Sequence, residues 1–315
     1  MKILSQAPSR ISLFGSGTDV APFSETEGGV IINLAINLRQ LMILYTKDDM
    51  FEAGINNIFP NNANPHFVYK ILDYHKINGL HHIRVKSYFD GFIGAGLGSS
   101  GAASVALIGA INRIRNLNLS RDEIASEAWR MENEVVGNFG GKQDQYAATY
   151  GGLNQIYIGR EVLVRPLVTI HQDELLSSLV LIYLGGKRED KLQEGLKVMT
   201  QDKLEALNRI KKIAIRAVEY IKTGDIEMVA KLLNRSWEEK KKTNKVSNKT
   251  IDEAYDLGMA NGAWGGKIMG AGGGGYMVFM CDPLKKEAFI LNMKKYGLEN
   301  VDFSIDKNGL ETKIL

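Results

Sequence analysis

The spacing of hydrophobic and polar residues changes along the chain. In the first part, short apolar runs at 30–32 and 41–45 and an alternating segment at 82–86 predict strands joined by turns. Further apolar runs at 153–158 and 179–184 predict two more strands. The first half of the chain is therefore expected to be rich in strand, with two helices.

Helical spacing begins after Gly98, where apolar residues recur three and four positions apart. This pattern predicts an amphipathic helix over roughly 99–117. Ser120 and Glu123 form a capping-box pattern, in which the serine side chain accepts from the glutamate backbone and the glutamate side chain reaches back. A second helix is therefore expected over roughly 121–136.

The second half is helical and highly charged from about 190 to 243, with Gly224 and Asp225 marking the change from one helix to the next. Thr250 and Glu253 repeat the capping-box pattern. A buried strand, a helix and a final pair of strands are then expected, at 274–280, 284–296 and 301–314. This part of the chain is expected to form an α+β layer.

Composition limits the class of protein. With 315 residues there is room for about two domains, which we place at 1–170 and 171–315. Apolar residues make up 44% and charged residues 24%, which indicates a folded chain. Cys281 is the only cysteine, so no intramolecular disulfide can form. With no signal-peptide pattern and no run of about 18 apolar residues, we expect a cytoplasmic protein without a membrane partner.

The net charge of +3 is too small to indicate nucleic-acid binding, which usually needs a concentrated basic face. The most basic run is 240–242, followed by Lys245. We interpret it as the solvated end of a helix, and a phosphate-facing patch is the alternative.

Glycine is the unusual component. Most of the 33 glycines fall in four windows, at 15–29, 91–101, 137–152 and 258–275. The window that ends at Gly101 leads directly into the predicted helix, whose first backbone N–H groups have no partner within the helix. Glycines allow such a backbone to close onto an anion, so this loop predicts a phosphate cradle.

The same loop also permits two other interpretations, besides a glycine turn that binds nothing. Gly96, Gly98 and Gly101 satisfy the G-x-G-x-x-G spacing of dinucleotide-binding proteins, which would make the chain an oxidoreductase. No alternation of strands and helices follows, so this reading is disfavoured. A Walker A loop is excluded because Lys267 is followed by Ile268 rather than Ser or Thr.

Three segments together resemble the three motifs of the GHMP kinases, in order and spacing: 7–19, 94–103 and 266–275. The segment 141–154 is most similar to the D-glycero-D-manno-heptose 7-phosphate kinase branch of that family. The resemblance implies an α+β fold of two domains, the first like ribosomal protein S5 and the second ferredoxin-like. It also implies ATP and Mg²⁺ as cofactors, a small-molecule substrate and a homodimer.

The resemblance also implies roles for individual residues. Asp144 is the candidate general base, with orientation of the hydroxyl as an alternative role and a helix N-cap as the structural alternative. Arg10 would orient Asp144 or stabilise developing charge, unless it forms a purely structural ion pair. The residues expected to cradle the ATP phosphates are Gly94, Ala95, Gly96, Leu97, Gly98, Ser99, Ser100 and Gly101.

Mg²⁺ would be held by Ser100 and by one glutamate of the following helix. Glu132 is preferred over Glu134, and the two side chains are expected on different helix faces. Contacts to the acceptor are expected from residues of three separate segments: Gly17, Thr18, Asp19, Lys142, Arg188, Gly272, Gly273 and Gly274.

Some positions depart from the heptose kinase pattern. Ser16 replaces a glycine, the stretch 185–193 matches only in part, and 30–37 is more apolar than a sugar site suggests. We therefore predict an ATP-dependent kinase of a sugar or sugar phosphate. The alternatives are a mevalonate or mevalonate-phosphate kinase of isoprenoid biosynthesis, and a non-catalytic regulator on the same fold.

Overall fold

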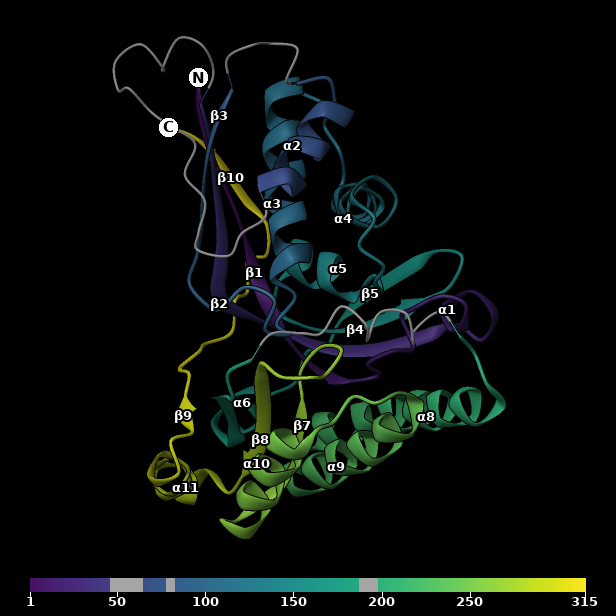
Figure 1. Cartoon of the computed structure of the whole chain (residues 1–315), viewed down its shortest axis with the longest axis vertical. Helices are drawn as coiled ribbons and strands as arrows, with labels where there is room; N and C mark the ends of the chain where they lie inside the picture. The colour runs from purple at the N-terminus through teal and green to yellow at the C-terminus, as the bar shows by residue number, and fades with distance from the viewer. Residues whose placement is uncertain (46–64, 78–82, 187–197) are drawn as a thin grey trace.

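The computed structural model describes residues 1–45, 65–77, 83–186 and 198–315. Figure 1 shows a sheet covered by helices in the upper part of the molecule and a second, mainly helical part below it, with both termini close together at the top. Each of the two parts therefore combines a sheet with helices, as expected for an α+β fold of two domains. Within the described ranges, every helix is too short or too polar to cross a membrane.

The larger sheet is antiparallel, in the order β10-β1-β2-β4-β5, and β3 also pairs with β2. Its strands are β1 (Lys2–Phe14), β2 (Gly29–Tyr45), β3 (Arg84–Phe89), β4 (Leu153–Ile158), β5 (Val162–Pro166) and β10 (Glu311–Ile314). The smaller sheet has the order β7-β8-β6-β9. Its strands are β6 (Leu179–Tyr183), β7 (Ala263–Ile268), β8 (Tyr276–Cys281) and β9 (Glu299–Asn300).

Helices surround both sheets. Those of the first part are α1 (Phe23–Thr26), α2 (Pro65–Tyr74), α3 (Ser99–Arg115), α4 (Arg121–Arg130), the π-helix η2 (Met131–Val136) and α5 (Gln143–Tyr150). Those of the second part are α6 (Gln172–Ser178), α8 (Gln201–Thr223), α9 (Ile226–Thr243), α10 (Lys249–Ala260), the 3₁₀ turn η3 (Pro283–Lys285) and α11 (Lys286–Lys295).

Strand β2 explains how the two parts share a core. Its first eight residues are all buried, whereas inward and outward positions alternate further along the strand. A strand that is covered on both faces reads as a continuous apolar run, and one that is covered on one face alternates. The continuous part meets the core formed with α8, α9 and the second sheet, and the alternating part meets α2 and α3. The apolar residues at 30–36 therefore pack in the protein core.

Several sequence predictions are confirmed in detail. Helix α3 begins at Ser99, and Ser120 and Glu123 form both hydrogen bonds of the capping box at the start of α4. Gly224 ends α8 with a positive φ, and the side chain of Asp225 caps α9. Cys281 is a free, buried cysteine.

Other predictions need correction. The apolar runs at 30–32 and 41–45 belong to the single long strand β2, and the first part also contains α2 and α5. The proposed capping box at Thr250 is wrong, because Asn248 caps α10 by accepting from the N–H of Ile251.

The expected pair of strands at 301–314 does not form. β9 pairs with β6 of the second sheet, whereas β10 returns to pair with β1 of the first sheet, with Ile314 opposite Ile3. The boundary at residue 170 falls between β5 and β6, but the assignment of all of 171–315 to the second domain does not hold for β10.

Candidate active site

The glycine loop before α3 forms one wall of a cavity of about 380 Å³ between the two parts of the molecule. Gly94, Gly96 and Gly98 line this cavity together with Ser99 and Ser100, the first residues of the helix. Gly98 adopts a left-handed conformation, with φ of 73°, at the position before the helix. A glycine takes this conformation without strain, so the loop can turn its backbone toward an anion at the positive end of α3.

The remaining members of the predicted cradle hold the loop in place. Ala95 and Leu97 are 2% and 1% exposed and belong to the shared core. Gly101 lies against the catalytic candidate, because a Cβ at this position would be 2.6 Å from the Cβ of Asp144. The loop thus alternates between residues that face the cavity and residues that anchor it.

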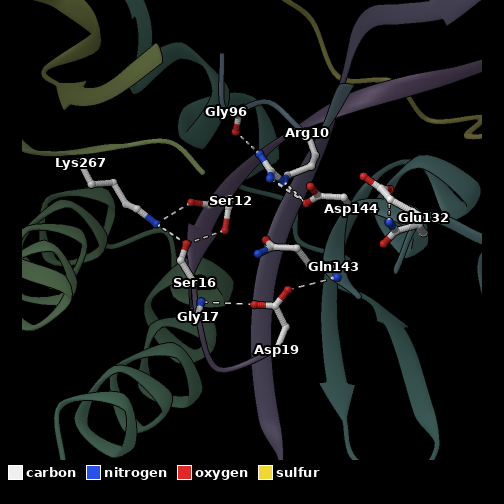
Figure 2. A network of polar contacts seen from close by, with 11 residues as sticks. Arg10, Ser12, Ser16, Gly17, Asp19, Gly96, Glu132, Gln143, Asp144 and Lys267 are labelled. Carbon is white, nitrogen blue, oxygen red and sulfur yellow. Dashed lines mark hydrogen bonds and ion pairs between the residues drawn. The ribbon is translucent and has the colours of Figure 1, made fainter. Parts of the chain in front are cut away.

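Asp144 and Arg10 meet at the centre of the site, although they are far apart in the sequence (Figure 2). Asp144 lies in the first turn of α5, and Arg10 lies on β1. Nε and Nη2 of Arg10 approach Oδ1 of Asp144 at 2.8 and 2.7 Å, and Nη1 donates to the carbonyl oxygen of Gly96 at 2.5 Å. Since Lys142 occupies the N-cap of α5, Asp144 is not a helix cap. The arginine therefore joins the carboxylate to the glycine loop.

Glu132 is the second carboxylate of the cavity. It lies in η2, is 7% exposed, and its Oε2 accepts from Nε2 of Gln145 at 2.7 Å and from Oγ of Ser104 at 3.2 Å. Ser100 also forms a hydrogen bond with this carboxylate, and burial raises its pKa above the ordinary value of a glutamate. Glu134 is exposed on another face of the same segment.

The donor atoms around Glu132 fit a magnesium ion. The partners of the buried carboxylate are neutral, so a cation beside it would offset the cost of burying its charge. A hydroxyl from Ser100 and an oxygen of Glu132 are both hard oxygen ligands at the edge of the phosphate loop. Mg²⁺ commonly uses one or two such protein ligands, with phosphate and water as the others.

Asp19 is the third carboxylate, and Figure 2 shows it below Asp144, apart from Glu132. Its Oδ1 accepts from the backbone N–H of Gly17 at 3.2 Å, and its Oδ2 accepts from that of Gln143 at 3.3 Å. Burial, followed by the charge of Asp144, raises the pKa of Asp19, whereas the Gln143 hydrogen bond and Lys240 act to lower it. The backbone thus fixes the carboxylate, which also lines the cavity.

The other predicted acceptor residues differ in where they lie. Gly17, Gly272 and Gly274 line the cavity with Asp19. Thr18 is buried in its own loop, where its hydroxyl exchanges hydrogen bonds with the backbone of Val30.

Three of the predicted contacts lie elsewhere or cannot be placed. Lys142 lies over the ring of Trp129, with Nζ 4.9 Å from the ring centroid. Gly273 instead contacts Val246 and Asn248 through its backbone. Arg188 falls outside the described residues.

Two lysines were missed as site residues. Lys240 of α9 is 7% exposed and lines the cavity beside Asp19, so the prediction of a solvated helix end is wrong for this residue. The helical spacing of the sequence could have indicated that Lys240 is buried, because it continues the buried stripe formed by Val229, Leu233 and Ser236. Lys267 of β7 is 1% exposed and donates to Ser16, in the loop that carries Asp19, without lining the cavity itself.

Comparison with known proteins assigns the chain to a family. Residues 66–152 match the GHMP kinases N terminal domain, and residues 217–298 match the GHMP kinases C terminal domain. This chain belongs to the GHMP kinases. The fold class predicted from the three motifs is therefore confirmed, and so is the prediction of an ATP-dependent small-molecule kinase. The dinucleotide-binding oxidoreductase and the non-catalytic regulator are set aside.

Individual relatives extend over almost the whole of this GHMP kinase. It is 33% identical to the D-glycero-alpha-D-manno-heptose 7-phosphate kinase of Campylobacter jejuni, with 98% of each chain covered. A crystal structure of a D-glycero-D-manno-heptose 1-phosphate kinase from Bacteroides thetaiotaomicron superimposes with a TM-score of 0.79 at 27% identity, covering 99% of each chain. The mevalonate kinase of Methanocaldococcus jannaschii is 26% identical over 93% of this chain and 96% of its own length.

Proposed function

We propose that this GHMP kinase transfers the γ-phosphoryl group of ATP to a hydroxyl of a heptose phosphate, with Mg²⁺ as the metal. The observation that carries the proposal is the pairing of a fixed carboxylate and a lysine at one end of the cavity, Asp19 and Lys240. The heptose phosphate kinases among its relatives support the same substrate class.

The chemistry of a sugar phosphate suits this end of the cavity. Both oxygens of Asp19 receive a backbone N–H, which leaves further lone pairs for hydroxyl groups of a polyol. Lys240 adds a positive charge on the same side, which suits an acceptor that carries a phosphate. The acceptor would then extend from Lys240 toward Asp144, where the reacting hydroxyl is placed.

Asp144 is proposed to orient the reacting hydroxyl and to accept its proton. Arg10 holds one carboxylate oxygen and leaves the other for the substrate, which fixes the direction of the lone pairs. Its remaining bond to the carbonyl of Gly96 ties this orientation to the phosphate loop. Phosphoryl transfer depends mainly on such positioning and on electrostatic stabilisation.

Ser100 and Glu132 are the proposed protein ligands of Mg²⁺. When bound there, the ion would neutralise charge on the ATP phosphates. Glu132 is held ready for this by Gln145 and Ser104, which fix its orientation.

A mevalonate-type acceptor is less well supported. That alternative depended on the apolar segment 30–37, but the segment belongs to β2 and its apolar residues pack in the core. In the described part of the chain, the cavity wall contains none of these residues. A homodimer and a cytoplasmic location remain predictions of the sequence.

The proposed function can be tested by measuring ADP release with a panel of acceptors. We expect turnover with D-glycero-D-manno-heptose 7-phosphate or 1-phosphate and none above background with mevalonate or mevalonate phosphate. A Glu132→Gln variant serves as the matched control for the metal site, because it keeps the volume and removes the charge. Efficient turnover of mevalonate with no activity on the heptose phosphates would refute the proposal.

A further inference from the structure

Lys267 is a fully buried lysine that joins the second domain to the first (Figure 2). It lies on β7, and its Nζ donates to the carbonyl oxygen of Ser12 at 2.8 Å, to Oγ of Ser16 at 2.8 Å and to the carbonyl oxygen of Leu13 at 3.4 Å. Burying an amine is costly unless several acceptors receive it. The three acceptors belong to one short segment of the first domain.

That segment needs a donor because the pairing of β1 with β2 is irregular there. Ser12 lies opposite Asn33 and Phe14 lies opposite Ile32, with a shift of register between them at Leu13. Such a bulge interrupts the ladder and leaves backbone groups without strand partners. Lys267 supplies hydrogen bonds to carbonyl groups at this point.

The same segment continues into the loop that carries Asp19. Ser16 is linked to Ser12 through their hydroxyl groups at 2.9 Å, in addition to its bond from Lys267. The next residue, Gly17, donates its N–H to Oδ1 of Asp19. A displacement of Ser16 would therefore move the donor that fixes the Asp19 carboxylate.

We propose that Lys267 is a positioning residue for the acceptor side of the site: it holds the 15–19 loop from the second domain and thereby sets the affinity for the acceptor rather than for ATP. The inference rests on the proposed role of Asp19. Burial, followed by the charges of Lys240 and Arg10, holds the pKa of Lys267 well below its ordinary value.

A steady-state experiment separates the two substrates. Lys267→Met keeps the length of the side chain and removes its donors, Ser16→Ala removes one acceptor, and Lys286→Met on α11 is the control for loss of a lysine outside the cavity. With D-glycero-D-manno-heptose 7-phosphate, we expect Lys267→Met to raise the acceptor KM about tenfold or more, and Ser16→Ala about threefold. The KM for ATP should stay within about twofold of the parent value.

The role of Lys267 is refuted if both KM values rise in equal proportion, or if neither changes in folded protein. Circular dichroism and thermal melting establish folding, and Ser16→Ala carries the test if Lys267→Met does not fold.

Hydrogen exchange of the enzyme without substrates tests the inference independently of the acceptor. We expect faster exchange in peptides covering 13–20 of Lys267→Met and Ser16→Ala, because the N–H groups of Gly17 and Thr18 are bonded within this loop. Peptides covering 94–103 should be unchanged. Unaltered exchange over 13–20 would refute the positioning role, whereas a wild-type enzyme inactive on heptose phosphates would refute only the proposed function.

Discussion

Replacing Lys240 with methionine tests whether this lysine binds a phosphate of the acceptor. The substitution removes one positive charge from the cavity wall and keeps an apolar side chain of similar length. At about 4 Å and an effective dielectric constant of about 20, an amine and one phosphate charge attract by roughly 4 kcal/mol. Desolvation of both groups offsets part of this, and hydrogen bonds to charged groups contribute about 1.5–3 kcal/mol net.

A net loss of about 2 kcal/mol corresponds to a rise of about 30-fold in the acceptor KM. The assay compares D-glycero-D-manno-heptose 7-phosphate with the same heptose lacking its phosphate, by ADP release at fixed, saturating ATP. For Lys240→Met we expect the acceptor KM to rise about 30-fold with the phosphorylated heptose. With the unphosphorylated heptose, the KM should change less than about threefold. Lys242→Met is the matched control, since Lys242 belongs to the same run but is 56% exposed and pairs with Glu239.

An equal loss of affinity for both sugars would refute direct phosphate binding by Lys240, because the lysine would then act through Asp19. Lys240 acts to lower the pKa of Asp19, so its removal favours the protonated carboxyl. In that case raising the pH would restore the affinity for both sugars. A direct loss of phosphate binding would persist at high pH and would diminish at high ionic strength in the parent enzyme.

Three further changes have defined outcomes. Asp144→Asn should lower kcat about 1,000-fold with little effect on the binding of ATP, measured by single-turnover kinetics and nucleotide titration. Gly101→Ala places a Cβ 2.6 Å from that of Asp144, and we expect kcat to fall at least tenfold, with Gly159→Ala as a control at ordinary contact distance. Asp19→Asn should abolish acceptor binding but raise the melting temperature at pH 8 by about 2 °C. The pKa of Asp19 is raised in the folded protein, so its contribution to stability falls as the pH rises through that pKa, and the difference should shrink toward pH 4.

A different result would contradict each of these three predictions. Turnover by Asp144→Asn at the parent rate would remove the general-base role, and equal rates for Gly101→Ala and Gly159→Ala would mean that the helix moves to relieve the contact. A melting temperature of Asp19→Asn below that of the parent at pH 8 would show that the charged carboxylate stabilises the fold.

The local parts of the site could be predicted from the sequence. The glycine loop and the helix that follows it are contiguous, so their geometry follows from spacing and from the exposed N–H groups of a helix start. Ser100, Glu132 and Asp144 were chosen by resemblance, and the structure brings them to one cavity. The preference for Glu132 over Glu134 also depended on the resemblance, because helix geometry alone predicts only that residues two apart point to different faces.

Long-range features could not be predicted in this way. The helix start at Asn248 competes with a capping pattern two residues later, and only the observed bond to Ile251 decides between them. The pairing of β10 with β1 joins the two ends of the chain, which no local pattern reports. The acceptors of the buried Lys267 lie at the bulge in β1, about 250 residues away in the sequence.

Two of the glycine clusters, 91–101 and 258–275, meet by a close approach of backbone to backbone between the two domains. A Cβ at Gly96 would lie 2.7 Å from the carbonyl oxygen of Met269, and one at Gly270 would lie 2.8 Å from the Cα of Gly96. The loop is held from one side by Arg10, which binds the carbonyl oxygens of both Gly96 and Leu97, and from the other by the N–H of Tyr276 on Ala95.

The glycine loop is therefore held by both domains rather than by one alone. Arg10 also holds Asp144, so the proposed phosphate cradle and the candidate carboxylate are tied to each other on the first-domain side of this contact. A side chain at Gly96 or Gly270 would collide with backbone of the other domain, and both residues also have a positive φ, of 96° and 66°. We therefore expect that the two domains have to dock correctly before the proposed cradle takes its shape, because residues of both domains form the contact.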